Sequence, residues 1–327
     1  MTVIASYGVA FPSLRLAADA YREAWGGCSA RGLRRKAFCA FDEDAVTLGI
    51  AAARDALDRA RTPAHEVAAL VVGTTTWPYE EKPAAANLVT ALLGGIPVRT
   101  MEIRGSRQAG LQALASASEF VAAHTGKLAL AVAVDAPTAS ADAPYEHALG
   151  AGAAAYVVAA EGGLATIESD AAVTVETFGS RFRRHGEIHI QDLELRVDDD
   201  RKSLDSLRRV YDPGSIARVA TGAAADFADR AARNFGGKPD QLWSELGDAG
   251  AASAPIALAH CLDEAKSGDR ILAVAVGGGA TALTVSARVN PFGPADVASR
   301  LGAGREVDYL SYLKHKKALN AGRSAHA

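Results

Sequence analysis

The sequence has no long hydrophobic run and few cysteines, which excludes several classes of protein. The apolar stretch 128–134 meets Asp135, far short of the roughly 20 residues that span a bilayer. Three cysteines, Cys28, Cys39 and Cys261, are an odd number without metal-ligand spacing, which argues against a disulfide framework and a zinc site. The first residues lack the basic segment of an export signal. We therefore expect reduced thiols, no metal, no membrane span and a cytoplasmic location.

A strong charge of either sign is also missing. The chain has 35 Lys and Arg against 38 Asp and Glu, a net charge of −3. The local basic runs 181–185 and 314–317 are more typical of solvated faces or anion contacts than of a nucleic-acid groove, so we expect no nucleic-acid partner. With 327 residues and 49% apolar content the chain can bury a large core.

Strand-like and helix-like patterns alternate along the chain, which is typical of a layered α/β fold. In the first half we expect strands at 2–10, 67–73, 98–103, 128–134 and 150–159, with helices at 45–61, 84–94 and 108–124. In the second half we expect strands at 216–220, 270–276 and 280–289, with helices at 222–235 and 253–266.

The second half repeats the order of the first, so we divide the chain into an N-terminal half, 1–165, and a C-terminal half, 166–327. The charged segment 174–210 interrupts the apolar pattern and is predicted to be a surface excursion, mostly loop or cap. A helix is expected within 306–319, and the last residues, 320–327, are expected to fray. The alanine-rich helix 108–124 can be packed closely on all sides and is predicted to be central.

Two loops carry the most chemical information. They are Gly73–Pro83, GTTTWPYEEKP, and Met101–Gly110, MEIRGSRQAG. The glycine-rich runs 150–155 and 277–279 lack a phosphate-loop pattern, so we reject nucleotide-dependent chemistry and assign these glycines to close backbone approach.

Six motifs occur in a sensible order over nearly the whole chain: 41–49, 73–83, 102–110, Glu146 with 150–155, 247–255 and 267–279. Together they resemble the hydroxymethylglutaryl-CoA synthase-like proteins of the thiolase superfamily, relatives of ketoacyl synthase III. The resemblance implies a thiolase-like fold, with two similar βαβαβ-type halves in five layers, αβαβα. It also implies a dimer formed through sheet edges.

The family takes an acyl group from CoA on a cysteine thiolate at a helix N-terminus, with a Glu or His moving protons. Carried over by resemblance, these positions differ in this chain. The cysteine position falls on Arg107, with Ser106 beside it; the acid-base Glu falls on Thr75, the His on Arg218, and the Asn of a Gly-Asn-x-x-Ser turn on Asp248, with Ser253 retained.

The resemblance also implies a set of substrate-binding residues. They are Pro78, Tyr79 and Lys82 in the substrate loop, Arg183 near the CoA entrance, and the glycines Gly277, Gly278 and Gly279. The expected ligand is a coenzyme A thioester or an acyl carrier protein, and no other cofactor is expected.

Two readings of Arg107 remain open. Arg107 and Asp248 add opposite charges at two loops that meet in the family fold, so they could form an ion pair that fills the acyl site. Alternatively, Arg107 meets Glu102 or a ligand anion, and Asp248 caps the following helix. Ser106 as a nucleophile would need an adjacent base, and no histidine lies in a motif that converges there.

The missing groups favour a degenerate condensing-enzyme homologue, which stabilises or shapes a catalytic partner in an acyl-CoA thiolase or hydroxymethylglutaryl-CoA synthase-like complex. The resemblance implies pairing with itself or with a thiolase-like condensing enzyme, and a small OB-fold/zinc-ribbon protein as a further partner. The alternative is an active acyltransferase, or an enzyme that makes or breaks carbon–carbon bonds, working without a cysteine.

Overall fold

In the part of the chain that the structure describes, ten strands form one sheet in which the two halves have the same topology. The computed structural model describes residues 1–177, 180–193 and 199–319. The spatial order is β10-β9-β11-β12-β8-β1-β7-β6-β4-β5, and β8 and β1 join the halves by antiparallel pairing. The first-half strands are β1 (Thr2–Ala10), β4 (Val67–Gly73), β5 (Arg99–Ile103), β6 (Leu128–Asp135) and β7 (Gly152–Ala159). The second-half strands are β8 (Ala165–Thr174), β9 (Arg218–Ala220), β10 (Lys238–Pro239), β11 (Arg270–Val276) and β12 (Gly279–Ala287).

Numbered along the chain within each half, the strands lie in the order 1-5-4-2-3 outward from the β1–β8 junction. The directions agree as well. β4 is parallel to β5 and β6, as β9 is parallel to β10 and β11, and the remaining pairs are antiparallel. The division proposed at 165/166 falls at the start of β8.

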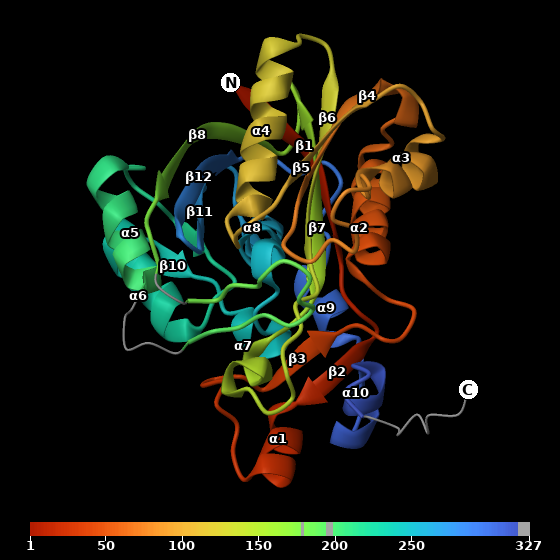
Figure 1. Cartoon of the computed structure of the whole chain (residues 1–327). Helices are drawn as coiled ribbons and strands as arrows, with labels where there is room; N and C mark the ends of the chain where they lie inside the picture. The colour runs from red at the N-terminus through yellow and green to blue at the C-terminus, as the bar shows by residue number, and fades with distance from the viewer. Residues whose placement is uncertain (178–179, 194–198, 320–327) are drawn as a thin grey trace.

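Helices cover both outer faces of the halves and fill the space between them, which gives the five layers expected (Figure 1). One outer layer holds α2 (Ala45–Ala60) and α3 (Ala85–Leu93), and the other holds α5 (Asp199–Val210) and α6 (Ala225–Phe235). The middle layer holds α4 (Ala109–Ala123) and α8 (Ser253–Glu264). The α/β, thiolase-like fold class is confirmed.

The central position of α4 depends on small residues. A Cβ built on Gly110 would lie 2.0 Å from the Ala251 carbonyl oxygen, so the helix backbone nearly touches the segment before α8. That segment is the 3-10 turn η3 (Gly250–Ala252). Glycine therefore sets the distance between the two middle helices at the end where the predicted site lies.

Gly110→Ala should lower the free energy of unfolding by about 1–3 kcal/mol, because the added methyl group meets backbone and not a movable side chain. Urea unfolding followed by circular dichroism measures the change. Gly27→Ala is the matched control, since nothing lies within 4 Å of its Cβ position. Equal midpoints for both variants would contradict the close approach.

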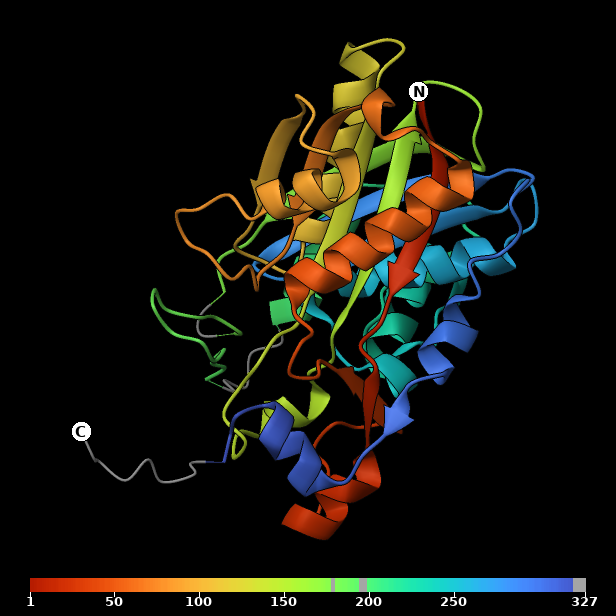
Figure 2. The ribbon, with the colours of Figure 1, turned by 90° about the vertical axis from the view of Figure 1, so that its right-hand side faces the viewer.

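A smaller unit of three strands and two helices lies below the main sheet (Figure 2). It consists of β2 (Leu14–Ala17), β3 (Arg35–Phe38), β13 (Arg305–Glu306), α1 (Ala18–Trp25) and α10 (Tyr309–His315). Its core holds the buried Lys36, whose Nζ lies 2.9 Å from Glu146 Oε1 and 3.0 Å from the Tyr312 hydroxyl. Glu146 comes from the 3-10 segment η2 (Pro144–Ala148), so this ion pair ties the small unit to the main sheet.

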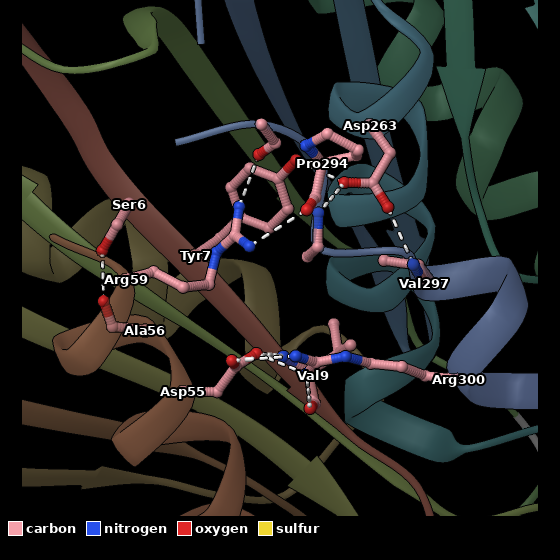
Figure 3. Close-up of polar contacts among 12 residues, drawn as sticks. Ser6, Tyr7, Val9, Asp55, Ala56, Arg59, Asp263, Pro294, Val297 and Arg300 are labelled. Carbon is pink, nitrogen blue, oxygen red and sulfur yellow. Dashed lines mark hydrogen bonds and ion pairs between the residues drawn. The ribbon is translucent and has the colours of Figure 1, made fainter. Parts of the chain in front are cut away.

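Polar contacts also join the two halves on the side shown in Figure 3. The Tyr7 hydroxyl of β1 donates to Asp263 Oδ1 at 2.6 Å, and Asp263 Oδ2 accepts from the backbone N–H of Val297 at 2.8 Å. Arg300 makes a two-point ion pair with Asp55 of α2. Val297 begins α9 (Val297–Gly302), which therefore links helices of both halves. The remaining short elements are α7 (Trp243–Leu246) and the 3-10 segment η1 (Ala64–Glu66).

Several expectations are corrected. Residues 199–210, predicted mostly as loop, form α5, and Leu204 and Leu207 are fully buried against the second-half sheet. Strand β8 was not predicted. The tail helix is confirmed only over Tyr309–His315, and 320–327, expected to fray, lie outside the described residues. Within the described residues, no helix has the length and apolar character that crossing a membrane requires.

Candidate functional site

Several of the predicted site residues gather where the carboxyl ends of β4, β6 and β11 meet the N-terminal end of α4. Arg107 lies two residues before the first residue of α4. Its Nη2 lies 2.7 and 2.8 Å from the two carboxylate oxygens of Asp200, and its Nη1 lies 3.8 Å from Asp248 Oδ2. The side chain is 22% exposed. Arg107 thus faces inward and is ion-paired.

Asp248 is held more tightly by Arg181 than by Arg107. Arg181 Nη1 donates to Asp248 Oδ2, and Asp248 Oδ1 accepts from the backbone N–H of Gly250 at 2.8 Å. Burial acts to raise the pKa of Asp248, but the charges of Arg181 and Arg107 outweigh it and hold that pKa below its usual value. Burial likewise acts to lower the pKa of Arg107, and the carboxylates of Asp200 and Asp248 outweigh that effect and raise it.

Of the two open readings of Arg107, the ion pair with Asp248 is met in part, and the contact with Glu102 is not. An Arg107–Asp248 ion pair exists, but it is the long contact in a cluster of two arginines and two aspartates. We call Arg107, Arg181, Asp200 and Asp248 the ionic cluster. Glu102 does not contact Arg107; it pairs with Arg104 and accepts from the Ala85 backbone N–H. Asp248 accepts a hydrogen bond from Gly250 in the turn before α8, but it does not cap that helix, whose N-cap residue is Ala252.

The ionic cluster lies between two cavities. The inner cavity, about 320 Å³, is lined by residues of the β9–α6 loop, α6 and the start of α8. The outer cavity, about 1070 Å³, is lined by the loops after β4, β5 and β6 and by parts of 177–193. Arg107 and Asp200 line both cavities, so their ion pair forms part of the wall between them.

Thr75 is fixed by a buried carboxylate. Its backbone N–H and hydroxyl donate to Asp135 at 2.6 and 2.8 Å, and the hydroxyls of Thr74 and Thr76 donate to the same side chain, each at 2.9 Å. Asp135 ends β6 and is fully buried. It also accepts from the Ala251 backbone N–H at 2.7 Å. One carboxylate thus holds the substrate loop and the turn before α8 together.

Ser106 has a local structural role. Its Oγ accepts from the Gln108 backbone N–H at 3.1 Å. The Gln108 side chain donates to the Gly277 carbonyl at 2.9 Å and accepts from the Thr281 hydroxyl at 2.8 Å. In the described part of the chain, no histidine or cysteine lines either cavity. Ser106 therefore has no histidine beside it there.

The three glycines differ in their surroundings. A Cβ on Gly277 would lie 3.2 Å from the backbone nitrogen of Arg107, and one on Gly279 would lie 2.0 Å from the Val173 carbonyl oxygen. Gly278 has open space around it. Gly277 and Gly278 line the outer cavity, and Gly279 instead lets β12 pass close to β8.

Of the other four predicted substrate-binding residues, two line the outer cavity and two do not. Pro78 and Arg183 line the outer cavity, and Arg183 donates to the Thr75 carbonyl at 2.7 Å. Tyr79 and Lys82 are not among its lining residues; the Lys82 ammonium lies 4.7 Å from the centre of the Tyr79 ring. These two side chains interact with each other outside the cavity.

Arg218 and Ser253 also lie in different places, and only Ser253 lines a cavity. Arg218 pairs with Glu264 and lines neither cavity, so the structure does not bring it to the ionic cluster. The β9–α6 loop reaches the inner cavity through Thr221 and Gly222 instead. Ser253 lines the inner cavity, and its buried Oγ has no hydrogen-bond partner in the described chain.

The cysteines lie elsewhere. Cys261 is buried within α8, and burial raises the pKa of its thiol well above the usual value. Burial also raises the pKa of Cys39, to about 12. Raised thiol pKa values disfavour the nucleophilic thiolate. The described residues contain no cluster of His, Cys, Asp and Glu suited to a metal.

Three site residues were missed from the sequence. Asp135 could have been found, because an acidic residue at the end of a buried apolar strand must be paired with polar partners. Asp200 lies in the charged excursion, where nothing distinguishes it from its acidic neighbours. Arg181 was considered only within the basic run 181–185, as part of a solvated face or an anion contact, and not as a partner of Asp248.

Comparison with known proteins identifies the family. Residues 212–289 match the family described as 3-oxoacyl-[acyl-carrier-protein] synthase III, C-terminal. The hydroxymethylglutaryl-CoA synthase of Pyrobaculum neutrophilum is 30% identical over 96% of this chain and 97% of its own length. The chain belongs to the hydroxymethylglutaryl-CoA synthase family.

Solved structures of hydroxymethylglutaryl-CoA synthases agree with this fold. One, complexed with CoA, is 18% identical, with a TM-score of 0.82 over 96% of this chain and 90% of its own. The synthase of the curacin biosynthetic pathway, in complex with an acetyl donor acyl carrier protein, is 17% identical, with a TM-score of 0.77 over 96% of this chain and 87% of its own. These two likenesses bear on the fold alone.

Proposed function

We propose that this chain is a non-acylating member of the hydroxymethylglutaryl-CoA synthase family, which stabilises or shapes a catalytic thiolase-like partner. The observation that carries the proposal is Arg107. An arginine, engaged with Asp200 and near Asp248, stands at the position that the resemblance assigns to the acylated cysteine. A guanidinium stays protonated and has no nucleophilic lone pair for acyl transfer.

The surroundings support the same conclusion. Thr75 stands where the resemblance places a proton-transferring carboxylate, and its backbone N–H and hydroxyl both donate to Asp135. No histidine of the described chain lines the cavity beside Ser106. By the resemblance, two groups on which covalent acyl transfer depends in the family, the cysteine and the proton-transferring carboxylate, have no equivalent at these positions.

The partners in this proposal come from the family. The chain would pair with itself or with a thiolase-like condensing enzyme through β5, an edge strand whose Arg99 and Thr100 are exposed. A small OB-fold/zinc-ribbon protein would complete the cytoplasmic complex. The ligand would be a coenzyme A thioester or an acyl carrier protein, as in the relatives solved with CoA and with an acyl carrier protein.

Reconstitution tests the proposal. The chain, the thiolase-like protein encoded nearest to its gene, and their mixture are each given acetyl-CoA and assayed for CoA release. We expect no release by the chain alone, and faster release by the mixture than by the thiolase-like protein alone. Turnover by the chain alone, unchanged in the mixture, would contradict the proposal.

A second function keeps one observation in its favour. The two cavities remain, and their combined volume suits a ligand of moderate size. An enzyme that makes or breaks carbon–carbon bonds without a covalent cysteine would use such a space. Turnover by the chain alone, without any acylated intermediate, would select this alternative.

A further inference from the structure

A buried histidine in η2, His147, contacts the backbone of the small unit. Its side chain is 8% exposed, and its ring stacks on Tyr21 of α1 with the ring centres 4.0 Å apart. The backbone N–H of Ser29 donates to its Nδ1 at 3.1 Å. Because a backbone N–H can only donate, Nδ1 must carry a lone pair, and the imidazole is neutral with its hydrogen on Nε2. A protonated ring would have a hydrogen on both nitrogens and would lose this contact.

Ser29 belongs to a loosely built loop, residues 26–34 between α1 and β3, which we call the Ser29 loop. Gly26 and Gly32 have positive φ angles of 76° and 79°, and nothing lies within 4 Å of a Cβ built on Gly26, Gly27 or Gly32. Glycines on both sides of Ser29 let this part of the loop move with little hindrance. The two hydrogen bonds of Ser29, to His147 and to the Pro144 carbonyl, both attach the loop to η2.

The Ser29 loop reaches the inner cavity through Trp243. The indole N–H of Trp243 donates to the Arg31 carbonyl at 3.1 Å, and Trp243 lines the inner cavity. Trp243 is the first residue of α7, and its carbonyl accepts from the Gly247 N–H at 3.0 Å, immediately before Asp248 of the ionic cluster. A displacement of the loop would therefore change one wall of the inner cavity.

The charges that act on His147 are those of Glu146, in its own segment, and Lys36 of β3. The Glu146 carboxylate is already bound by the Lys36 ammonium and by two tyrosine hydroxyls. The other titratable side chains around this site are Tyr21 of α1, Cys28 beside Ser29, and Tyr309 and Tyr312 of α10, which pack against Tyr21.

Burial, the largest cause, and the Lys36 charge hold the pKa of His147 below its usual value, although Glu146 opposes them. The unfolded chain, with an ordinary histidine pKa of about 6.5, then binds this proton more readily than the folded chain. The stabilisation is therefore fully present above about pH 6.5 and is lost as the pH falls below that value. The contact with Ser29 should follow the same direction.

We propose that His147 and Ser29 form a pH-sensitive latch, in which protonation of His147 releases the Ser29 loop from η2 and loosens the Trp243 wall of the inner cavity. A protonated Nδ1 can still donate to the Ser29 hydroxyl, 3.1 Å away, but the Ser29 backbone N–H then points at a hydrogen. This inference goes beyond the proposed function, because it concerns the response of the site to pH and holds with or without acyl transfer.

Hydrogen exchange of the full chain at pH 7.5 and 5.5, read by mass spectrometry and corrected for the intrinsic exchange rates, tests the latch. In the wild type, protection of residues 26–34 should fall about fivefold or more at pH 5.5, as expected for one lost hydrogen bond, and protection of 243–247 should fall with it. His147→Asn offers a carbonyl oxygen near the Nδ1 position that does not titrate, so its loop should stay protected at both pH values. His124→Asn, at an exposed histidine bound to the Phe120 carbonyl, is the matched control and should respond as the wild type does.

The difference between the wild type and His147→Asn decides the matter, and the wild-type comparison stands by itself if that variant does not fold. Equal corrected protection of 26–34 at the two pH values in the wild type would overturn the proposal. So would the same fall in His147→Asn, or a fall confined to 26–34 that leaves 243–247 unchanged. An equal fall in α2 would show acid unfolding of the whole chain and would overturn it as well.

Discussion

Asp135→Ala is expected to lower the free energy of unfolding by at least ~3 kcal/mol, because it leaves several buried hydrogen-bond donors without an acceptor. The Asp135 carboxylate accepts hydrogen bonds from the hydroxyls of Thr74, Thr75 and Thr76 and from the backbone N–H groups of Thr75 and Ala251. Each donor that loses its acceptor in the water-free interior destabilises the folded state, because the alanine side chain cannot accept a hydrogen bond. Chemical unfolding in urea, followed by circular dichroism, measures the loss.

The same substitution should loosen the site. Asp135 holds the β4 loop against the turn before α8, so amide hydrogen exchange of Thr75, Thr76 and Ala251 should become faster while α2 stays protected. Asp142→Asn is the matched control, because Asp142 is a surface carboxylate bound to the nearby Ser140 hydroxyl. If Asp135→Ala were no less stable than this control, the buried carboxylate would not be the link described.

Glu146→Gln is expected to cost about 3–5 kcal/mol at neutral pH, because it leaves the buried Lys36 ammonium without a counter-charge. Lys36 is fully buried, and the hydroxyls of Tyr21 and Tyr312 bind the same carboxylate. The double variant Lys36→Met, Glu146→Gln removes both charges and should recover most of the loss. Urea midpoints of the single and double variants give the comparison, with the exposed Glu306→Gln as the control.

The cost of Glu146→Gln should depend on pH. Burial lowers the pKa of Lys36 to about 8 in the wild type, although Glu146 counteracts the effect. Without Glu146 the pKa of Lys36 falls further, so the folded variant loses this proton below pH 8 while the unfolded chain keeps it. The unfolded state then binds more protons, and the variant gains stability with rising pH. The deficit should be smaller at pH 8 than at pH 6, and a deficit that grows would contradict the buried ammonium.

Much of the fold could be predicted because apolar periodicity reports burial directly. The predicted strand 67–73 agrees with β4, and the predicted helix 45–61 agrees with α2, which begins after Asp44 with a capping box formed by Asp44 and Thr47. β8 was not predicted, because the second half of this strand consists of exposed and half-buried residues with few large apolar side chains. α5 was not predicted, because its many charged residues conceal the two leucines that are buried against the sheet.

The site could be predicted only where residues are close in sequence to a motif. Arg107, Asp248 and Thr75 lie in loops whose meeting follows from the fold. Asp200 and Arg181 reach the cluster from a segment whose path depends on tertiary packing, so a sequence pattern contains no sign of their contacts. Arg218 lies at the start of β9, whereas the cavity is reached from the loop that follows the other end of this strand, at Thr221 and Gly222.

Incubation of the purified full chain with acetyl-CoA, followed by intact-mass and peptide analysis, tests the central claim most directly. Arg107 cannot hold an acyl group, and no cysteine or histidine of the described chain lines the two cavities, so the protein should keep its unmodified mass. An acetyl group on Ser106, or on any cysteine, at stoichiometric yield would contradict the account.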